Sequence, residues 1–333
     1  MVAVTQLSEF SFIDTIADLT ARGPASTKVR VGIGDDAAVL AAIAKPIVTT
    51  DTMTEAVHFE SDWLSARAIG VRAFRVAFSD IAAMGASPKF ALLSLGMVPG
   101  YSLSKARGML KGFLGECADC RVSLVGGNLS SSTALSITVT AIGEGGRRTP
   151  LRSGARAGHA VYVTGTLGDA AAGVEFLRTG RRRGRFVDAY RSPPRNLELG
   201  RALARASGLG AMIDLSDGLV QDLEQICKAS VLSARLDLCR VPLSAALRRS
   251  ASSGGALEAG ALDYALRGGD DYELLFTGRP TRGFRTAVAR LAQKYRTPIT
   301  AIGIMEEADP FPHVIDWSGR RLCGGFRHFE EAP

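Results

Sequence analysis

Acidic side chains occur in this sequence at positions where the neighbouring residues predict an apolar core. Asp35 and Asp36 follow three apolar residues that alternate along the chain. This alternation predicts the buried face of a strand, formed by Val29, Val31 and Ile33. Two carboxylates placed directly after such a strand are unfavourable in a protein interior unless hydrogen bonds or cations compensate them.

Three more segments place acids and hydroxyl groups at the ends of apolar elements. One ends a predicted strand, one lies among alanines near the end of a predicted helix, and one follows a short apolar run. Each residue taken singly is compatible with a helix cap, a turn or a local ion pair, which are common uses of these side chains. The residues are Thr49, Thr50, Asp51, Asp80, Asp214, Ser216 and Asp217.

The aspartates of these segments are more informative as a group. If they converge in the fold, two carboxylates about 4 Å apart repel each other by roughly 4 kcal/mol at an effective dielectric constant of about 20. Such a cluster requires cations, and oxygen ligands without histidine or cysteine favour Mg²⁺ over zinc. Because protein-bound Mg²⁺ commonly bridges phosphates, the group predicts chemistry on phosphorylated ligands. The group consists of Asp35, Asp51, Asp80 and Asp214.

The sequence has none of the usual phosphate-binding loops. Neither a P-loop nor a complete GxGxxG motif occurs, so metal ions would have to replace much of what backbone amides and a lysine supply there. Gly126, Gly127 and Asn128 follow the predicted strand 121–125 and allow a ligand to approach the backbone closely. A turn explains the same three residues equally well.

Composition indicates a globular protein whose ligands or partners are anionic. The chain has 333 residues, of which 46% are hydrophobic, enough for a substantial core that would usually divide into two domains. Its net charge of +7 permits binding to nucleic acids or membrane surfaces but equally suits a small anionic substrate. The densest basic run, residues 181–185, lacks interleaved aromatic residues, so we expect a solvated loop and no nucleic-acid partner.

Cysteine usage and hydropathy favour a cytoplasmic protein without a membrane partner. Five cysteines, an odd number spread along the chain, are typical of a reducing compartment. Cys117 and Cys120 have CxxC spacing, but no second half-site follows, so ordinary thiols fit better than a zinc site. The N-terminus lacks the basic region of a signal peptide, and no run of about 18 apolar residues occurs.

Strands and helices alternate along the sequence, which predicts a mixed α/β (α+β) fold. The clearest element is a helix over about 62–84, where apolar residues recur every three or four positions. A Gly- and Arg-rich segment after Ile142 predicts a connection between two domains, residues 1–145 and 146–333. We expect strands at 29–33, 47–51, 90–97, 121–125, 135–142, 160–164 and near Leu236 and Tyr272, and helices after Gly168, after Pro194 and at Ser216.

Nine motifs occur in the order found in one known family. From about Glu9 to Phe329 the sequence resembles the thiamine-monophosphate kinases, which belong to the aminoimidazole-ribonucleotide synthetase-like superfamily. One motif of this kind would carry little weight, whereas nine in register are specific. The motifs are GIGDDAAVL, TTDTMTEAVHF, FSDIAAMGASP, VGGN, RSGARAGH, VTGTLGDAAAG, SPPRN, IDLSDGLVQDL and GGDDYELLF.

The resemblance implies an enzyme that uses ATP to phosphorylate thiamine monophosphate to thiamine diphosphate by direct in-line transfer. It implies an N-terminal ATP- and Mg²⁺-binding domain whose sheet pairs in a homodimer, and a C-terminal domain that completes the active-site cleft. Catalysis would depend on several Mg²⁺ ions and Arg152 rather than on a general base, because the attacking phosphate is already ionised.

The resemblance also assigns roles to individual residues. For Mg²⁺ binding it implies Asp35, Thr49, Thr50, Asp51, Asp80, Asn128, Asp214 and Asp217. For ATP binding it implies Gly127, Asn128, Arg152 and Ser216. For the thiamine substrate it implies His58, Asp270 and Phe326, of which the acid and the ring suit a cationic thiazolium. The residues expected to act in catalysis are Asp35, Asp51, Asp80, Asp214 and Arg152.

Three residues depart from the pattern common in this family. Asn128 stands where aspartate is usual, Asp270 where glutamate is usual, and Phe326 where tyrosine or tryptophan is frequent. Asn128 removes one negative charge from the predicted metal site. Two alternatives to this kinase therefore stay open. One is another ATP-using enzyme of the same superfamily, and the other is a paralogue that binds nucleotide or thiamine phosphate without turnover.

Overall fold

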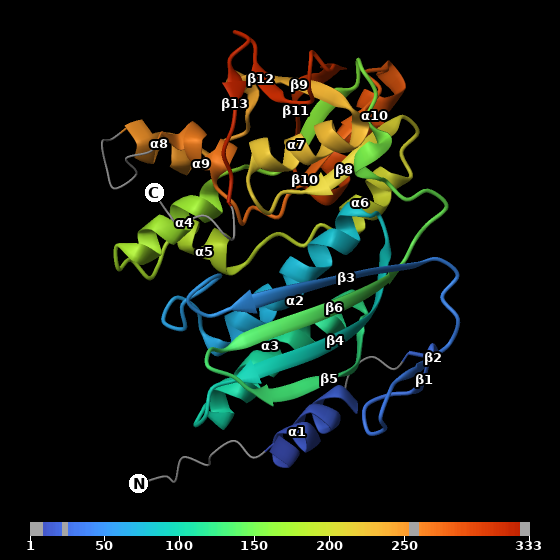
Figure 1. Ribbon diagram of the computed structural model, residues 1–333, viewed down its shortest axis with the longest axis vertical. Coiled ribbons are helices and arrows are strands. Elements are labelled where there is room, and N and C mark those ends of the chain that lie inside the picture. Colours follow the sequence, from blue (N-terminus) through green and yellow to red (C-terminus); the bar gives the residue numbers. More distant parts are fainter. Residues whose placement is uncertain (1–8, 22–25, 253–259, 327–333) are drawn as a thin grey trace. The chain divides into compact units, whose positions relative to one another are not determined.

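The computed structural model describes residues 9–21, 26–252 and 260–326, which form two compact units (Figure 1). The N-terminal unit contains the described residues up to 145, except for 82–85. The C-terminal unit contains residues 82–85 and the described residues from 146 onward. Each unit has its own sheet and helices, so the prediction of a mixed α/β fold is confirmed.

The N-terminal unit is built on a four-stranded sheet and two long helices. Their bounds are β3 Pro46–Thr54, α2 Ala66–Ala83, β4 Ser87–Met97, α3 Leu103–Cys120, β5 Ser123–Ser131 and β6 Ser136–Glu144. The strand order is β3-β6-β4-β5, in which β4 and β5 are parallel and the other neighbours antiparallel. Both helices lie on one face of this sheet (Figure 1).

The two helices of the N-terminal unit pack closely because each presents a glycine to the other. A Cβ atom on Gly70 of α2 would lie 1.9 Å from the Met109 carbonyl oxygen, and one on Gly112 of α3 would lie 2.1 Å from that of Arg67. Such distances exclude any side chain at either position. The backbones of α2 and α3 are therefore in direct contact.

The helix predicted over 62–84 is confirmed as α2, slightly shorter at both ends. Its buried side chains recur at three- and four-residue steps, as its apolar pattern requires. Phe74 stacks on Phe78 with ring centroids 4.2 Å apart, which adds to the apolar contact that holds this helix in place.

The first predicted strand is partly wrong. β1 (Val29–Val31) pairs with β2 (Val39–Leu40) in a separate two-stranded sheet and ends before Ile33. Val31 is 36% exposed, so the alternating apolar residues do not form a buried face. The positions after this strand are therefore not core positions, because the small sheet to which it belongs leaves them open to solvent.

The C-terminal unit contains a seven-stranded sheet. Its strands are β7 Ala160–Thr164, β8 Leu209–Asp214, β9 Leu232–Leu236, β10 Leu274–Gly278, β11 Ile299–Glu307, β12 Val314–Asp316 and β13 Arg321–Leu322. Their spatial order is β13-β12-β9-β11-β7-β10-β8, and every neighbouring pair is antiparallel except β12 with β9. β8 and β10 are buried along their whole length, which explains why their sequences are almost continuously apolar.

Helices connect the strands of the C-terminal unit. They are α4 Asp169–Arg178, α5 Arg185–Arg191, α6 Leu197–Ala204, α7 Leu219–Ser230, α8 Ala245–Ser252, α9 Ala261–Arg267 and α10 Arg282–Tyr295, with 3-10 turns η1 Arg152–Gly154 and η2 Leu238–Arg240. The helices predicted after Gly168, after Pro194 and near Ser216 are confirmed as α4, α6 and α7. α7 packs its apolar residues, among them Leu223 and Ile226, into the main core cluster of this unit.

The basic segment 181–185 is not the fully solvated loop that its composition predicts. The Arg182 guanidinium donates to the Leu177 carbonyl at 2.6 Å, and Arg185 forms an ion pair of 3.1 Å with Asp169. Part of its positive charge is therefore used to hold α4 and α5 together.

Candidate functional site

Strand β3 and helix α2 bring a hydroxyl group and two carboxylates to one side of the N-terminal sheet. The Thr49 hydroxyl donates a hydrogen bond of 2.5 Å to Asp80 Oδ2, near the end of α2. Side chains alternate along a strand, so Thr49 and Asp51 share the face of β3 that is turned toward α2. Thr49, Asp51 and Asp80 form the first acidic set, and they offer oxygen ligands only.

Thr50 and Asn128, two further predicted metal ligands, lie on the opposite face of the same sheet. The Thr50 hydroxyl is 3.3 Å from the Thr140 hydroxyl in β6. Asn128 pairs with Ser94 of β4, and the pairing continues across β6 to residues of β3 that lie on the same face as Thr50. Because paired residues of neighbouring strands point to the same side, Asn128 lies on that face too. Moreover, β5 is the edge strand farthest from β3. One chain alone does not bring these two side chains to Thr49, because strand alternation turns them away.

Asp35 lies in the segment between β1 and β2. Its carboxylate accepts the N–H of Asp36 at 2.8 Å, its only side-chain hydrogen bond within the described ranges. The residue is exposed, so its charge is solvated and requires no cation for folding. This differs from the expectation that Asp35 occupies a position that should belong to the core.

His58 follows β3 in a tight turn of the N-terminal unit. The ring nitrogen Nδ1 of His58 accepts the Thr54 backbone N–H at 3.0 Å, and the backbone N–H of His58 donates to the Thr54 carbonyl at 2.8 Å. Because Nδ1 is an acceptor, the neutral ring carries its proton on Nε2. The imidazole is thereby fixed at the end of the strand that carries Thr49 and Asp51.

A second acidic set, Asp214, Asp217 and Asp222, lies where β8 leads into α7 in the C-terminal unit. Asp214 is the last residue of β8 and is only 7% exposed. The Asp217 N–H donates to the Asp222 carboxylate at 3.0 Å, and Gln221 donates to Asp217 Oδ2 at 3.0 Å. The other carboxylate oxygen of Asp217 is 3.4 Å from the Ser216 hydroxyl. Local hydrogen bonds therefore fix the conformation of this loop.

Asp222 belongs to this set although the sequence analysis did not identify it. Burial, followed by the charges of Asp217 and Asp214, raises its pKa to about 8. A signal was present, because Asp222 lies three residues after Leu219 and four before Ile226, on the apolar face of α7. An acid at a core position of an amphipathic helix is unusual and marks a residue with a specific partner.

Two of the three residues predicted to bind thiamine, Asp270 and Phe326, lie next to the second acidic set. The Asp270 N–H donates to the Ser216 carbonyl at 2.9 Å, and the Phe326 N–H donates to the Asp217 carbonyl at 3.0 Å. Asp270 has a φ of 71°, a left-handed conformation that is uncommon outside glycine. The Phe326 ring is 44% exposed. The C-terminal unit thus brings Asp214, Ser216, Asp217, Asp270 and Phe326 together.

Two buried carboxylates support the Asp270 segment from the interior. Asp271 accepts the Gly168 N–H at 2.9 Å, and Glu273 accepts hydrogen bonds from the Thr164 hydroxyl and the Asn196 amide. Burial raises the pKa of both carboxyl groups. Glu273 and Asn196 are not recognisable as site residues from the sequence, because their partners are distant along the chain.

The Arg152 backbone lies at the opposite end of α7 from the second acidic set. Its carbonyl accepts the Ser230 hydroxyl at 2.8 Å, at the C-terminal end of α7. α7 has 12 residues and is therefore roughly 18 Å long, with Asp217 just before its other end. The reason is local packing, because Gly154 of the same turn lies against Gly210 at the start of β8.

Glycine is required at position 127 by strand packing, which the sequence alone does not reveal. It lies inside β5 rather than after a strand, and a Cβ atom there would be 1.9 Å from the Leu93 carbonyl oxygen of β4. The neighbouring strand therefore requires glycine at this position, whatever the role of Gly127 in ligand binding.

The two acidic sets contain suitable atoms for Mg²⁺ without forming a ready cluster. Within residues 9–21, 26–252 and 260–326, no three His, Cys, Asp or Glu side chains come together as a metal site. Carboxylates and hydroxyl groups, with no thiol or imidazole among them, are nevertheless the ligands that Mg²⁺ prefers. The donor chemistry therefore fits this ion.

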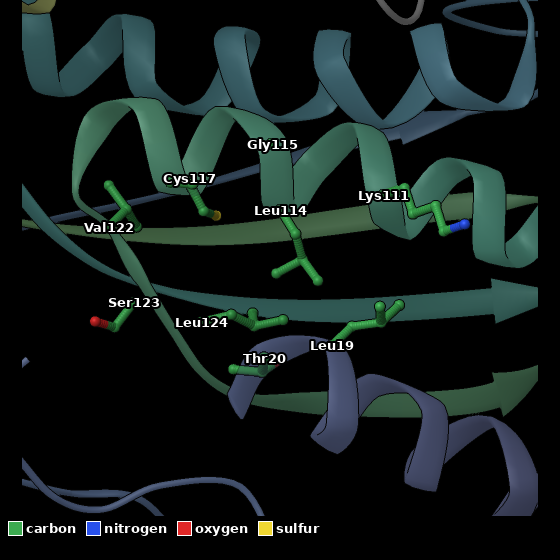
Figure 2. Close-up of a pocket in the computed structure, with 10 residues that line it drawn as sticks. Leu19, Thr20, Lys111, Leu114, Gly115, Cys117, Val122, Ser123 and Leu124 are labelled. Atoms are coloured by element: carbon green, nitrogen blue, oxygen red, sulfur yellow. The ribbon is translucent and has the colours of Figure 1, made fainter. Parts of the chain in front are cut away.

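A cavity of about 230 Å³ in the N-terminal unit lies apart from these residues. The helix α1 (Glu9–Ala21) closes it against α3 and the start of β5, as Figure 2 shows. Its lining is mainly apolar, with Leu19, Leu114 and Leu124 among the side chains, and contains none of the predicted site residues. A cavity with few convergent polar groups does not resemble a site for phosphorylated ligands.

All five cysteines lie within the described residues. None of these five cysteines forms a disulfide bond. Among the described helices, none has both the length and the apolar character that a membrane span needs.

Two protein-domain families match successive parts of the chain. The family "AIR synthase related protein, N-terminal domain" matches residues 34–144. The family "AIR synthase related protein, C-terminal domain" matches residues 156–309. Both matches lie in the order that the two units have along the chain.

Thiamine-monophosphate kinases are similar to this chain over nearly its whole length. The thiamine-monophosphate kinase of Bacillus subtilis is 33% identical over 331 residues, covering 95% of this chain and 99% of that protein. The crystal structure of thiamine-monophosphate kinase from Stenotrophomonas maltophilia is 34% identical, with a TM-score of 0.80 and coverage of 93% and 97%. The structure of AaThiL complexed with AMPPCP and TMP is 30% identical, with a TM-score of 0.75 and coverage of 97% of each chain.

Proposed function

The chain belongs to the thiamine-monophosphate kinase family, and from this premise we propose that it transfers the terminal phosphoryl group of ATP to thiamine monophosphate. The product is thiamine diphosphate, so the chain is an enzyme, a phosphotransferase with a phosphate group as acceptor. Direct in-line transfer suffices, because the attacking phosphate is already an anion and no side chain has to remove a proton from it.

One observation carries the proposal at the level of the site. Backbone hydrogen bonds join Asp270 and Phe326, which suit the thiazolium of thiamine, to Ser216 and Asp217 in the second acidic set. A substrate with a cationic ring at one end and a phosphate at the other matches this arrangement of an acid, an exposed ring and a metal-binding loop.

We assign the acidic side chains to Mg²⁺ binding. Bound Mg²⁺ would neutralise the phosphate charges and stabilise the charge that develops on the transferring group. The first acidic set supplies Thr49, Asp51 and Asp80, and the second supplies Asp214 and Asp217. Asp35 is proposed as an additional ligand, and its exposed carboxylate needs no rearrangement to accept an ion.

The remaining predicted residues are assigned to the two organic ligands. His58, with its proton on Nε2, is suited to donate a hydrogen bond to the substrate phosphate. Gly127, Asn128 and Ser216 are proposed to contact ATP. Arg152 is proposed to bind ATP and to help neutralise its phosphate charge during transfer.

We also propose a homodimer formed through the open face of the N-terminal sheet, in the cytoplasm. This face carries Val48, which is 61% exposed, and the paired hydroxyl groups of Thr52 and Thr138, 2.9 Å apart. Thr50 and Asn128 stand on the same face, where residues of a second copy would be their neighbours. The free cysteines support a reducing compartment.

The dimer is tested by measuring the molar mass in solution. Light scattering after size-exclusion chromatography should give twice the mass of the 35.1 kDa chain. Val48→Asp should shift the protein to monomer, because it places two like charges in the contact. A monomeric wild type would contradict the proposal.

The activity is tested by coupling ADP release to a spectroscopic readout. We expect ADP only when ATP, thiamine monophosphate and Mg²⁺ are all present, and none after addition of EDTA. Thiamine diphosphate should appear in equal amount by chromatography. Tight binding of both ligands without ADP would contradict the kinase assignment and support the paralogue without turnover.

A further inference from the structure

Three hydrogen bonds join the start of α7, the loop before it and the residues after β13. The Gln221 side-chain amide donates to Asp217 Oδ2 at 3.0 Å and to the Phe326 carbonyl at 2.7 Å. The Phe326 N–H donates to the Asp217 carbonyl at 3.0 Å. Since a primary amide has two hydrogens, one on each partner, Gln221 uses its full donor capacity to hold Asp217 and Phe326 at once.

The residues after β13 follow a path that depends on neighbouring side chains. Arg267 of α9 donates to the Cys323 carbonyl at 2.9 Å. Gly324 and Gly325 both have positive φ angles, 109° and 154°. A Cβ atom on Gly325 would lie 2.5 Å from the Gln221 Cβ, so the backbone passes in contact with that side chain. Gln221 therefore defines where Phe326 is placed.

The same amide restricts the orientation of Asp217. One carboxylate oxygen accepts from Gln221, while the backbone N–H of Asp217 donates to Asp222. Partners of this kind, one step removed from an ion, orient its ligands and increase their affinity for it. Among the described residues, the second oxygen, Oδ1, has only a long contact of 3.4 Å to the Ser216 hydroxyl and keeps its capacity to bind a cation.

We propose that Gln221 is a positioning residue that couples binding of the thiamine substrate to binding of the divalent cation. The inference rests on the proposed function, which places the substrate at Phe326 and the cation at Asp217. A substrate that orders Phe326 also orders the Gln221 amide, and with it the Asp217 carboxylate. The effect is reciprocal, because coupling between two ligands acts equally in both directions.

The test measures binding without turnover. Thiamine monophosphate is titrated calorimetrically onto the full chain with AMPPCP, once in EDTA and once with saturating Mg²⁺. Mn²⁺, used as a spectroscopic substitute, is titrated with and without thiamine monophosphate and followed by electron paramagnetic resonance. In wild type, each ligand should tighten binding of the other.

The decisive variant is Gln221→Met, which removes both donors and keeps the side-chain length and helix propensity. We expect the Kd of Mn²⁺, and the Kd of thiamine monophosphate with Mg²⁺, to rise about 5- to 30-fold, by loss of an orienting hydrogen bond at each site. The factor by which each ligand lowers the Kd of the other should fall close to one.

Two further variants separate coupling from general loosening of the fold. Gln225→Met makes the same chemical change one turn later on α7, where the described structure gives the side chain no hydrogen bond, and should behave as wild type. Arg267→Met releases the Cys323 carbonyl, so it should weaken binding of thiamine monophosphate while the Kd of Mn²⁺ alone stays unchanged.

The possible results are distinguishable. If Gln221→Met binds both ligands with the affinities and coupling of Gln225→Met, the inference is wrong. The proposed function still stands in that case, provided that the wild-type protein binds both ligands. If wild type binds no thiamine monophosphate, the proposed function and the inference both fail. Should Gln221→Met not fold, Gly325→Ala displaces the backbone from Gln221 and must show the same loss of coupling.

Discussion

The two acidic sets differ in how the protein tolerates their charge. In the N-terminal unit, Asp51 and Asp80 are half-buried beside the Thr49 hydroxyl, so water reaches the carboxylates. In the C-terminal unit, Asp214 and Asp222 are 7% and 3% exposed, and backbone N–H groups contact the acids there. Burial raises the pKa of Asp222 to about 8.

The difference shows that a group of acids does not by itself require cations for folding. Solvent stabilises the first set, whereas in the second set hydrogen bonds stabilise the acids and burial favours the protonated form of Asp222. Substitution in the first set should therefore affect chemistry far more than stability. Substitution near the second set should affect both, because its carboxylates are part of the hydrogen bonding of the core.

The largest effect is expected for Asp80→Asn in the first set. Loss of the charge should lower kcat/KM by about 10²- to 10³-fold, comparable to the loss of one charge-stabilising group in other enzymes. The free energy of unfolding should change by less than about 1 kcal/mol, because the residue is half-buried. Steady-state kinetics and urea denaturation measure the two. A lower free energy of unfolding with an unchanged kcat/KM would contradict the expected difference between the two acidic sets.

The next effect concerns a predicted ATP contact in the N-terminal unit. Gly127→Ala should destabilise this unit by about 2–4 kcal/mol, because its methyl group would meet the Leu93 backbone. Gly126→Ala is the matched control, since its methyl group would meet only a flexible Leu92 methyl group at 3.1 Å. Urea denaturation of both variants measures the difference. Equal stabilities would show that the two strands separate easily at this position.

A third prediction uses the raised pKa of Glu273, which supports the second set. Its pKa in the folded state lies above its ordinary value of 4.5 because of burial, so the folded protein holds this proton more tightly than the unfolded chain. The stabilisation is complete below pH 4.5 and is lost as pH rises through the folded pKa, with a slope of at most about 1.4 kcal/mol per pH unit.

Glu273→Gln removes this titration while its amide oxygen still accepts hydrogen bonds from Thr164 and Asn196. The free energy of unfolding of the variant should therefore fall less steeply above pH 4.5 than that of wild type. Urea denaturation at a series of pH values measures the slopes. Identical slopes would show that the carboxyl group is ionised in the folded protein.

The smallest effect should distinguish the two faces of β3. Thr49→Ala removes the hydroxyl bonded to Asp80 and should weaken Mn²⁺ binding about tenfold. Thr50→Ala removes a hydroxyl on the other face and should change it less than about threefold, an effect near that of an ordinary surface substitution. The reverse order would place the cation on the open face of the sheet.

Sequence reasoning succeeded where the determining interactions are local. The periodicity of α2 and the apolar run of β7 depend on neighbouring residues, and both elements occur as predicted. β1 shows the limit, because alternating valines in an exposed two-stranded sheet look the same as those of a buried strand.

The site was predictable in its residue types more than in its arrangement. The motifs named Asp217, Asp270 and Phe326, but their mutual hydrogen bonds depend on chain paths that only the fold defines. Two features were within reach of the sequence. Strand alternation separates Thr49 from Thr50, and an acid just before a predicted helix start is within reach of a side chain in the first turn, as Asp217 is of Gln221.

The glycine contact between α2 and α3 has a consequence for the first acidic set. Asp80 lies ten residues after Gly70 on the same rigid helix, roughly 15 Å along its axis. A methyl group at Gly70 would push the two backbones apart and tilt α2, which would displace the Asp80 carboxylate relative to Thr49. Selection for catalysis should therefore act on a residue that never meets a ligand, and tolerance to mutation in this enzyme will follow the spacing of its helices as much as its distance from the substrates.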